Sequence, residues 1–300
     1  MQVRTEFPSV PFTWGQTRRL GCRRWNLDAA VRERTLLRLF TGVYVRADVE
    51  LTPVLRAQAA LLVMSRHSVL CDRSAAWIHG VDVHRFRERD VVPQLESYVL
   101  RGHDPTDRPE CNGGTRDLLP VDWMTIGGVR VTTPLRTAMD LGCKLSRRDA
   151  LAAMDALARI HGITLAEMLR LLPRYFRRRG VVQLRELIPL VDGSSESPGE
   201  SWTRLEILDR GLPSPRLQHW VCVDGVPTYR LDLAYPHARV AIEYDGEEFH
   251  SSPADREADR VRRAWLREQG WTVIVVTKHD FTPDATDRWI REVRDALGLR

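Results

Sequence analysis

Lysine is nearly absent from this sequence of 300 residues, where only Lys144 and Lys278 stand among 45 basic side chains. Cysteine is also scarce. The five cysteines are far apart and include no CxxC pair, which argues against a disulfide framework and a zinc site and is typical of a reducing cytosol. No apolar run approaches the roughly 18 residues of a membrane span. The N-terminus lacks the basic stretch and apolar core of a secretion signal. The sequence therefore predicts a cytoplasmic protein with no membrane segment.

Arginine is abundant within an otherwise ordinary globular composition. With 43% hydrophobic and 28% charged residues, wholesale disorder, collagen and coiled coil are excluded, and the length predicts about two or three domains. A net charge of +5 and a pI near 9.2 permit nucleic-acid binding without proving it. Arginine suits phosphate and base-edge recognition because its planar fork donates two parallel hydrogen bonds. A GC-rich genome explains the same abundance equally well.

Residues 1–50 form a small basic segment in which two short helices precede a hairpin. We predict helices from Thr13 to Leu20 and from Asn26 to Glu33, with Asn26 as N-cap, and strands at 36–40 and 43–46. This order resembles a winged helix-turn-helix, whose second helix enters the major groove of DNA. The alternative is a packing module with a solvated charged face. The candidate DNA-binding residues are Arg18, Arg19, Arg23, Arg24, Arg32, Arg34 and Arg38.

Residues 51–192 are predicted to be a mostly helical middle domain. Apolar residues at helical spacing, with capping residues, indicate helices at 55–64, 74–80, 133–142, 147–160 and 165–172, and a strand at 128–132. The histidines of this segment share no metal-like spacing. A polar break from Asp192 to Gly199 then marks the start of a third domain, residues 193–300.

The third domain begins with a helix from Glu200 to Asp209 and continues with two alternating runs that read as a hairpin. If Pro236 to Arg239 forms the turn, Asp232 lies opposite Glu243, about 5 Å apart at Cβ. Side-chain alternation then divides the hairpin into two faces. The polar face contains Arg230, Asp232, Ala234, Ala241, Glu243 and Asp245, and the core face contains Leu231, Leu233, Val240 and Ile242. A charged helix (254–269) and a buried strand (271–276) complete a small three-layer α/β domain.

Three carboxylates on one face repel one another and raise each other's pKa. A hard divalent cation such as Mg²⁺ relieves this repulsion, because it takes oxygen ligands and often one or two carboxylates plus substrate phosphate. Such an ion activates water and stabilises the charge that develops on a scissile phosphate. The alternative is an exposed face whose carboxylates pair with nearby arginines such as Arg230.

The polar break, both strands of the hairpin and the last strand resemble the PD-(D/E)XK nuclease superfamily, and within it the very-short-patch-repair (Vsr-like) endonucleases. The matching stretches are Glu196-Ser197-Pro198-Gly199-Glu200-Ser201, Tyr229-Arg230-Leu231-Asp232-Leu233-Ala234-Tyr235-Pro236, Ala241-Ile242-Glu243-Tyr244-Asp245-Gly246 with His250, and Gly270-Trp271-Thr272-Val273-Ile274-Val275-Val276. The resemblance implies a restriction-endonuclease-like α/β/α fold.

The same resemblance implies roles for individual residues. Asp232 and Glu243 would bind Mg²⁺ (or Mn²⁺), and Glu200 on the preceding helix would assist. Asp245 occupies the position where much of the superfamily has a lysine that orients or activates the attacking water. His250 is then the candidate general acid/base.

Residues 1 to about 190 resemble AbiEi-like antitoxin regulators of type IV. The resemblance rests on three blocks: Arg38-Leu39-Phe40-Thr41-Gly42-Val43-Tyr44-Val45, Ser74-Ala75-Ala76-Trp77-Ile78-His79-Gly80 and Val131-Thr132-Thr133-Pro134-Leu135-Arg136-Thr137. It implies a DNA-binding regulator with a partner toxin or other defence protein.

The sequence thus predicts an α/β (α+β) multidomain protein and leaves three functions open. The first is a metal-dependent DNA endonuclease or nickase that an N-terminal DNA-binding domain places on its substrate. The second is a non-catalytic DNA-binding regulator or antitoxin whose nuclease-like domain serves binding or assembly. The third is an interaction scaffold in which both ends are degenerate.

Overall fold

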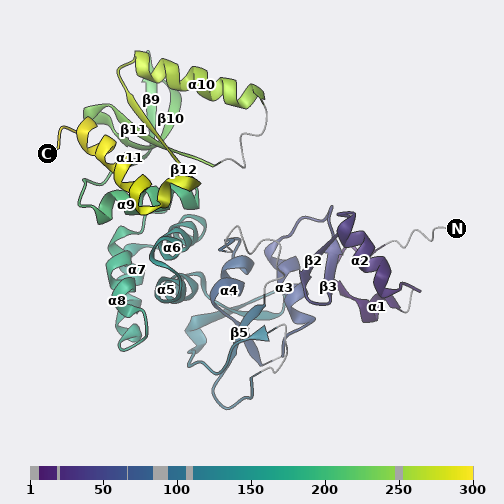
Figure 1. The fold of residues 1–300 in the computed structure, drawn as a ribbon. Coiled ribbons are helices and arrows are strands. Elements are labelled where there is room, and N and C mark those ends of the chain that lie inside the picture. Colours follow the sequence, from purple (N-terminus) through teal and green to yellow (C-terminus); the bar gives the residue numbers. More distant parts are fainter. Residues whose placement is uncertain are drawn as a thin grey trace. The chain divides into compact units, whose positions relative to one another are not determined.

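The computed structural model describes residues 7–18, 21–65, 67–83, 94–105, 111–246 and 253–299. The chain divides into two compact units, Met1–Leu141 and Gly142–Arg300, which Figure 1 shows in colours that follow the sequence. Among the described residues, no helix is long and apolar enough to cross a membrane. The units do not coincide with the expected segments 1–50, 51–192 and 193–300, and whether those segments fold alone remains a prediction.

The first unit opens with two short helices and a three-stranded sheet of order β1-β3-β2. The elements are β1 (Phe12–Thr13), α1 (Trp14–Arg18), α2 (Arg24–Arg32), β2 (Leu36–Phe40) and β3 (Val43–Arg46). The helix, helix, hairpin order is the one that the sequence predicts. The expected N-cap is wrong by one turn: Arg23 is the N-cap of α2, and the Asn26 side chain accepts a hydrogen bond from the Arg23 N–H at 2.9 Å.

A five-stranded mixed sheet of order β6-β5-β4-β8-β7 follows, within the segment that we expected to be mostly helical. Its elements are α3 (Pro53–Leu61), β4 (Ser68–Leu70), α4 (Asp72–Ile78), β5 (Leu95–Val99), β6 (Cys111–Asn112), η2 (Pro120–Asp122), β7 (Trp123–Ile126), β8 (Val129–Thr132) and α5 (Pro134–Lys144). The helices and β8 were expected. The remaining strands were not. β4 and β6 are too short to show a period of two, whereas the alternation of β5 was missed.

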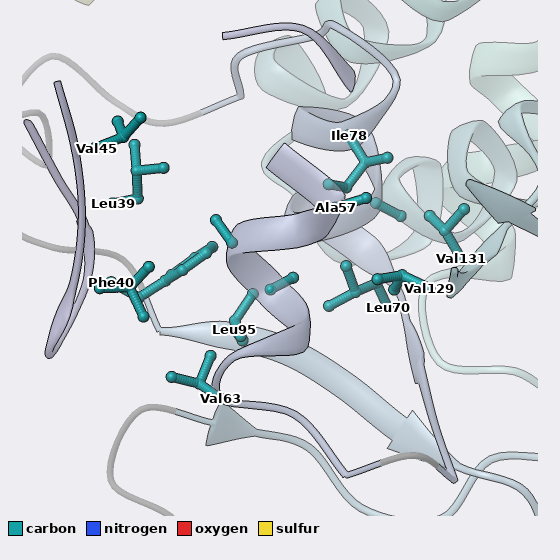
Figure 2. Close-up of a cluster of buried hydrophobic side chains, with 14 residues drawn as sticks. Leu39, Phe40, Val45, Ala57, Val63, Leu70, Ile78, Leu95, Val129 and Val131 are labelled. Carbon is teal, nitrogen blue, oxygen red and sulfur yellow. The ribbon is translucent and has the colours of Figure 1, made fainter. Parts of the chain in front are cut away.

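The hairpin of β2 and β3 belongs to two cores at once. Leu36 and Tyr44 pack in a small cluster with α2, whereas Phe40 and Val43 pack with α3, α4 and the five-stranded sheet. Figure 2 shows Leu39, Phe40 and Val45 facing Ala57, Leu70, Ile78, Leu95 and Val131 in this second core. Burial of both faces therefore ties the hairpin to the rest of the unit.

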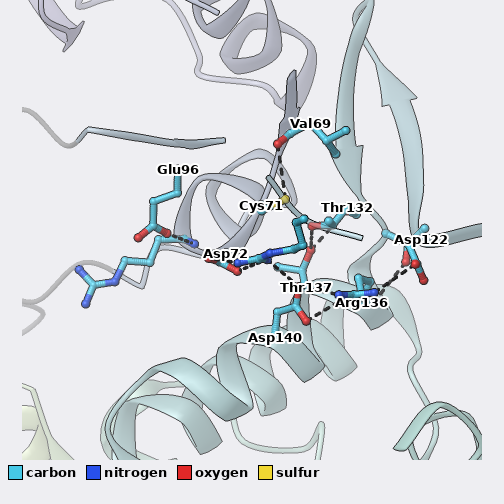
Figure 3. Close-up of polar contacts among 12 residues, drawn as sticks. Val69, Cys71, Asp72, Glu96, Asp122, Thr132, Arg136, Thr137 and Asp140 are labelled. Atoms are coloured by element: carbon cyan, nitrogen blue, oxygen red, sulfur yellow. Dashed lines mark hydrogen bonds and ion pairs between the residues drawn. The ribbon is translucent and has the colours of Figure 1, made fainter. Parts of the chain in front are cut away.

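Buried charges join α4 and α5 to the loops beside the five-stranded sheet. Arg116 donates to both Asp72 oxygens (2.9 and 3.0 Å) and to Asp140 (2.9 Å), and Arg136 donates to Asp140 and Asp122 (3.0 and 3.1 Å). The acids are almost fully buried, so each depends on an arginine for its charge balance. Figure 3 shows this arrangement around Arg136 and Asp140.

The second unit begins with helices that pack on the first helix of the C-terminal sheet domain. They are α6 (Arg147–His161), α7 (Leu165–Leu171), η3 (Leu172–Tyr175), α8 (Val181–Leu187), η4 (Ile188–Leu190) and α9 (Pro198–Asp209). Asp155 of α6 accepts hydrogen bonds from Ser201 (2.7 Å) and Arg204 (2.6 Å) of α9. All three side chains are buried, and the boundary that we expected near residue 192 falls between these bonded helices.

The C-terminal part is a four-stranded sheet of order β12-β11-β10-β9 with helices on both faces. Its elements are β9 (Arg216–Val223), β10 (Val226–Tyr235), η5 (Pro236–Ala238), β11 (Val240–Asp245), α10 (Pro253–Glu268), β12 (Thr272–Thr277), η6 (Lys278–Phe281) and α11 (Pro283–Ala296). One face packs with α9 and α11 and the other packs with α10, as Figure 1 shows. This is the three-layer α/β/α arrangement that the sequence predicts.

Candidate functional site

The hairpin of β10 and β11 has the register that the turn predicts. Leu233 pairs with Ile242 and Tyr235 with Val240, and Asp232 and Glu243 are the next residues of the two strands beyond this ladder. The turn between the strands is η5, and Arg239 closes it in a left-handed conformation (φ 51°). Neighbouring strands therefore bring these two carboxylates to one place in the sheet.

Side-chain alternation along β10 breaks at Asp232, contrary to expectation. Leu231 packs in the cluster beneath Leu266 of α10, whereas Leu233 packs in the cluster beneath α9 and α11. Two residues that are two positions apart in a regular strand share a face. The prediction that Leu231 and Leu233 lie on the same face is therefore wrong.

The neighbouring strand is irregular at the same level. Leu231 pairs with His219 and Leu233 with Leu217, which places Gln218 of β9 beside Asp232. Gln218 has a backbone φ of 49°, outside the range of a regular strand. The guanidinium of Arg230, which was expected on the polar face, binds Glu196 at 2.7 and 2.9 Å.

The Asp232 carboxylate is hydrogen-bonded to a backbone N–H and lies near two other carboxylates, those of Glu200 and Glu243. Its Oδ2 accepts a hydrogen bond from the Tyr244 N–H at 3.0 Å. Burial, and next the charge of Glu200, raise the pKa of Asp232 to about 7, with a smaller contribution from Glu243. The site therefore holds a proton at pH values at which an exposed aspartate has lost it.

Glu243 and Asp245 are neutralised by two arginines of α10. Glu243 Oε2 accepts from Arg262 at 2.8 Å and from Arg263 at 3.3 Å, and Arg263 also donates to Asp245 at 2.8 Å. Glu243 Oε1 is buried and has no hydrogen-bond partner among the residues that the structure describes. One oxygen of Glu243 is thus neutralised, while the other lacks the donor or cation that a buried carboxylate oxygen needs.

Glu200 approaches from the N-terminus of α9. The preceding Gly199 allows this approach, because a Cβ there would lie 2.1 Å from the Tyr244 ring. Glu200 Oε2 accepts from the Glu196 N–H at 2.9 Å and from Gln218 Nε2 at 2.8 Å. Burial raises the pKa of Glu200 above its ordinary value.

A divalent cation would meet two carboxylates here and not a complete protein cage. Among the described residues, no group of three or more His, Cys, Asp and Glu side chains has metal-binding geometry. The unpartnered Oε1 of Glu243 and the raised pKa of Asp232 nevertheless fit a cation that takes one or two carboxylates and completes its shell with water and phosphate. His250, the candidate general acid/base, lies outside the described residues.

Two domain families match the chain. Residues 68–190 match the AbiEi antitoxin C-terminal domain, and residues 219–297 match the restriction-endonuclease-like family REase_MTES_1575. The second match contains Asp232, Glu243 and Asp245, whereas Glu200 lies before its first residue. The expected architecture, an AbiEi-like segment followed by a restriction-endonuclease-like domain, is confirmed, whereas the Vsr-like assignment and the resemblance of residues 1–67 remain predictions.

Two full-length relatives occur in Mycobacterium tuberculosis, the uncharacterized proteins MT2308 of strain CDC 1551 and Rv2248 of strain H37Rv. Each is 33% identical over 257 residues, which cover 86% of this chain and 91% of the relative. The chain belongs to the family of these proteins. Since the alignment covers nearly all of both chains, its members share more than one isolated domain.

The N-terminal arginines of this family member are displayed to solvent. Six of the seven candidates are exposed: Arg18, Arg23, Arg24, Arg32, Arg34 and Arg38. Arg19 lies outside the described residues. The exposed arginines come from α1, α2, β2 and the turns beside them, and DNA contact by them remains a prediction.

Sequence reasoning missed three residues of the restriction-endonuclease-like domain that contact the carboxylates. Arg262 and Arg263 lie on a helix that was expected, but the carboxylates they bind depend on how α10 crosses the sheet. Gln218 lies on β9, which was not expected. The alternation of polar and apolar residues at the start of 216–223 could have predicted this strand, and Gln218 is a polar residue within it.

Proposed function

We propose that this protein is a metal-dependent DNA endonuclease or nickase that hydrolyses phosphodiester bonds. The observation that carries the proposal is the buried Asp232, which lies close enough to Glu200 and Glu243 for their charges to raise its pKa, in the restriction-endonuclease-like domain. Burial and the charge of Glu200, with a smaller contribution from Glu243, raise the pKa of Asp232, and a bound cation would offset these effects.

Asp232 and Glu243 would hold Mg²⁺ or Mn²⁺, with Glu200 assisting. The bound ion would supply water activation and stabilise charge on the scissile phosphate. Asp232 would be positioned by the Tyr244 N–H and Glu243 by Arg262 and Arg263. These arginines give the site positive charge in a domain that has Asp245 where related nucleases have lysine.

Residues 1–50 would place the nuclease domain on DNA. Their exposed arginines are suited to phosphate contacts, which supply sequence-independent affinity, and α2 would be the helix that enters the major groove. His250 is proposed as general acid/base on the resemblance alone.

Plasmid nicking tests the proposal. Purified protein is incubated with supercoiled plasmid and Mg²⁺ or Mn²⁺, beside Asp232→Ala, Glu243→Ala and His250→Ala. We expect the wild type to nick the plasmid and Asp232→Ala and Glu243→Ala to nick it at least about 100-fold more slowly. In excess EDTA the wild type should not nick the plasmid at all. Absence of nicking by the wild type, or equal nicking by Asp232→Ala, would refute the proposal.

A non-catalytic DNA-binding regulator is the second candidate, and two observations favour it. Residues 68–190 match an antitoxin domain, and the ion pairs of Arg262 and Arg263 neutralise Glu243 and Asp245 without a metal. In that case the protein, alone or with a partner toxin, would retard its own promoter fragment specifically, with no cleavage under any divalent ion.

A further inference from the structure

Gln218 adopts a backbone conformation that its strand does not require. Its φ of 49° lies in the left-handed region, which glutamine enters at a conformational cost. The residue stands in β9 between pairs of regular register, His219 with Leu231 and Leu217 with Leu233. Strain of this kind persists where the surroundings impose it, and it is concentrated at functional sites.

The conformation directs the Gln218 amide to the carboxylates. Nε2 donates to Glu200 Oε2 at 2.8 Å, and the same oxygen accepts from the Glu196 N–H at 2.9 Å. Glu200 in turn is close enough to Asp232 for its charge to raise the pKa of that residue. The Gln218 amide therefore holds in place the carboxylate of Glu200, whose charge raises the pKa of Asp232 more than any other charge does.

The other end of the amide meets no hydrogen-bond donor within the part of the chain that the structure describes. Gln218 Oε1 is buried there, and with Glu243 Oε1 it is one of two such acceptors on β9 and β11, the strands on either side of β10. Buried acceptors are almost always satisfied in folded proteins, by protein or by water. Two unsatisfied acceptors beside one aspartate indicate a site that is complete only when water or a cation is bound.

We propose that Gln218 is a positioning residue of the nuclease site, which holds Glu200 toward Asp232 and offers Oε1 to a water in the site. This inference rests on the proposed function. It adds a residue outside the restriction-endonuclease-like match, which begins at residue 219. It also gives a reason for the broken pleat: a regular β9 would point the Gln218 side chain elsewhere.

The test compares Gln218→Met with Gln183→Met in the full chain. Methionine keeps the length of the side chain and removes both the carbonyl oxygen and the NH2 group of the amide. Gln183 is the matched control, since its Nε2 also donates within the second unit, to the carbonyls of Gly142 (2.8 Å) and Leu145 (3.0 Å), away from the carboxylates. Gln218→Asn is a second variant, because asparagine tolerates a left-handed backbone but is one methylene shorter.

Two readouts decide the outcome. Carboxyl-carbon NMR of the metal-free protein is expected to show a higher pKa of Glu200 in both Gln218 variants and no change in Gln183→Met. Calorimetric titration with Mn²⁺ is expected to show about 10-fold weaker binding in the Gln218 variants, at a melting temperature equal to that of the control.

Unchanged Glu200 titration in both Gln218 variants would overturn the inference, as would Mn²⁺ affinity equal to that of the wild type. A wild type that binds no Mn²⁺ refutes the proposed function instead. The NMR titration is made without metal, so it still decides whether Gln218 holds Glu200.

Discussion

The carboxylate of Asp232 accepts a hydrogen bond from the backbone N–H of Tyr244 at 3.0 Å, just beyond the last pair of the β10–β11 ladder, Leu233 with Ile242. This bond occupies a backbone donor at the end of the β10–β11 ladder. The acid is thereby fixed in place beside a second acid, and the pair is neutralised on one side only, by Arg262 and Arg263.

The metal-free protein is expected to lose stability as the pH rises from about 4 to 7. Asp232 has a pKa of about 7 in the folded chain and about 3.8 when unfolded, so between these values the folded state keeps a proton that the unfolded state has lost. Asp232→Asn cannot lose a proton and should be more stable than the wild type at pH 8, by about 2–4 kcal/mol.

Urea unfolding in EDTA at pH 5 and pH 8 measures this effect. The exposed Asp284 provides the control, since Asp284→Asn should leave the difference between the two pH values unchanged. A wild type whose stability rises between pH 5 and pH 8, or an Asp232→Asn variant that is less stable at pH 8, would contradict the raised pKa.

The N-terminal arginines are expected to carry DNA affinity. Replacing Arg23, Arg24 and Arg32 by alanine should weaken binding to a duplex about 10- to 100-fold and reduce the salt slope by about 3. An equal change of charge elsewhere, in Arg170, Arg179 and Arg185, is the control. Fluorescence anisotropy over a range of salt concentrations checks both. Equal losses in the two triple variants would show that only total charge matters.

A fragment that begins at the expected boundary near residue 192 is predicted to be unstable. A fragment of residues 193–300 lacks Asp155, which leaves the buried Arg204 and Ser201 of α9 without their acceptor. It should be several kcal/mol less stable than residues 142–300, and Asp155→Ala should cost the full chain about 3–5 kcal/mol. Equal urea midpoints for the two fragments would establish residues 193–300 as an independent domain.

Arg136 is expected to be essential to the first unit. Arg136→Met removes the arginine at 3.1 Å from Asp122 and one of the arginines that bind the buried Asp140, and should destabilise by about 3–5 kcal/mol. Arg101 pairs with Asp117 at the surface, so Arg101→Met should leave the free energy of unfolding nearly unchanged. Chemical unfolding of both variants measures the difference, and similar values would contradict a structural role for the buried ion pairs.

The sequence predicts the fold where local signals suffice. Strands β2 and β3 have the predicted bounds, and the Pro236 turn predicts the register of Asp232 with Glu243, because two neighbouring strands and a short turn leave little freedom. The sheet around β4 and β5 was missed, since its short strands are stabilised by partners that are distant in the sequence.

The geometry of the candidate site depends on contacts that no local pattern encodes. The break at Asp232 lies beside Gln218, whose left-handed backbone on the neighbouring strand no local pattern predicts. The ion pairs of Glu243 depend on the side of the sheet on which α10 lies. The residue types were therefore predictable, whereas the face of each side chain and its partners were not.

A crystal of the full chain soaked in Mn²⁺ tests the central claim most directly. The account predicts an anomalous peak about 2.1 Å from oxygens of both Asp232 and Glu243, with Glu243 Oε1 as one of them. A saturating soak with no peak at this pair, and with Arg262 and Arg263 still bound to Glu243, would contradict it.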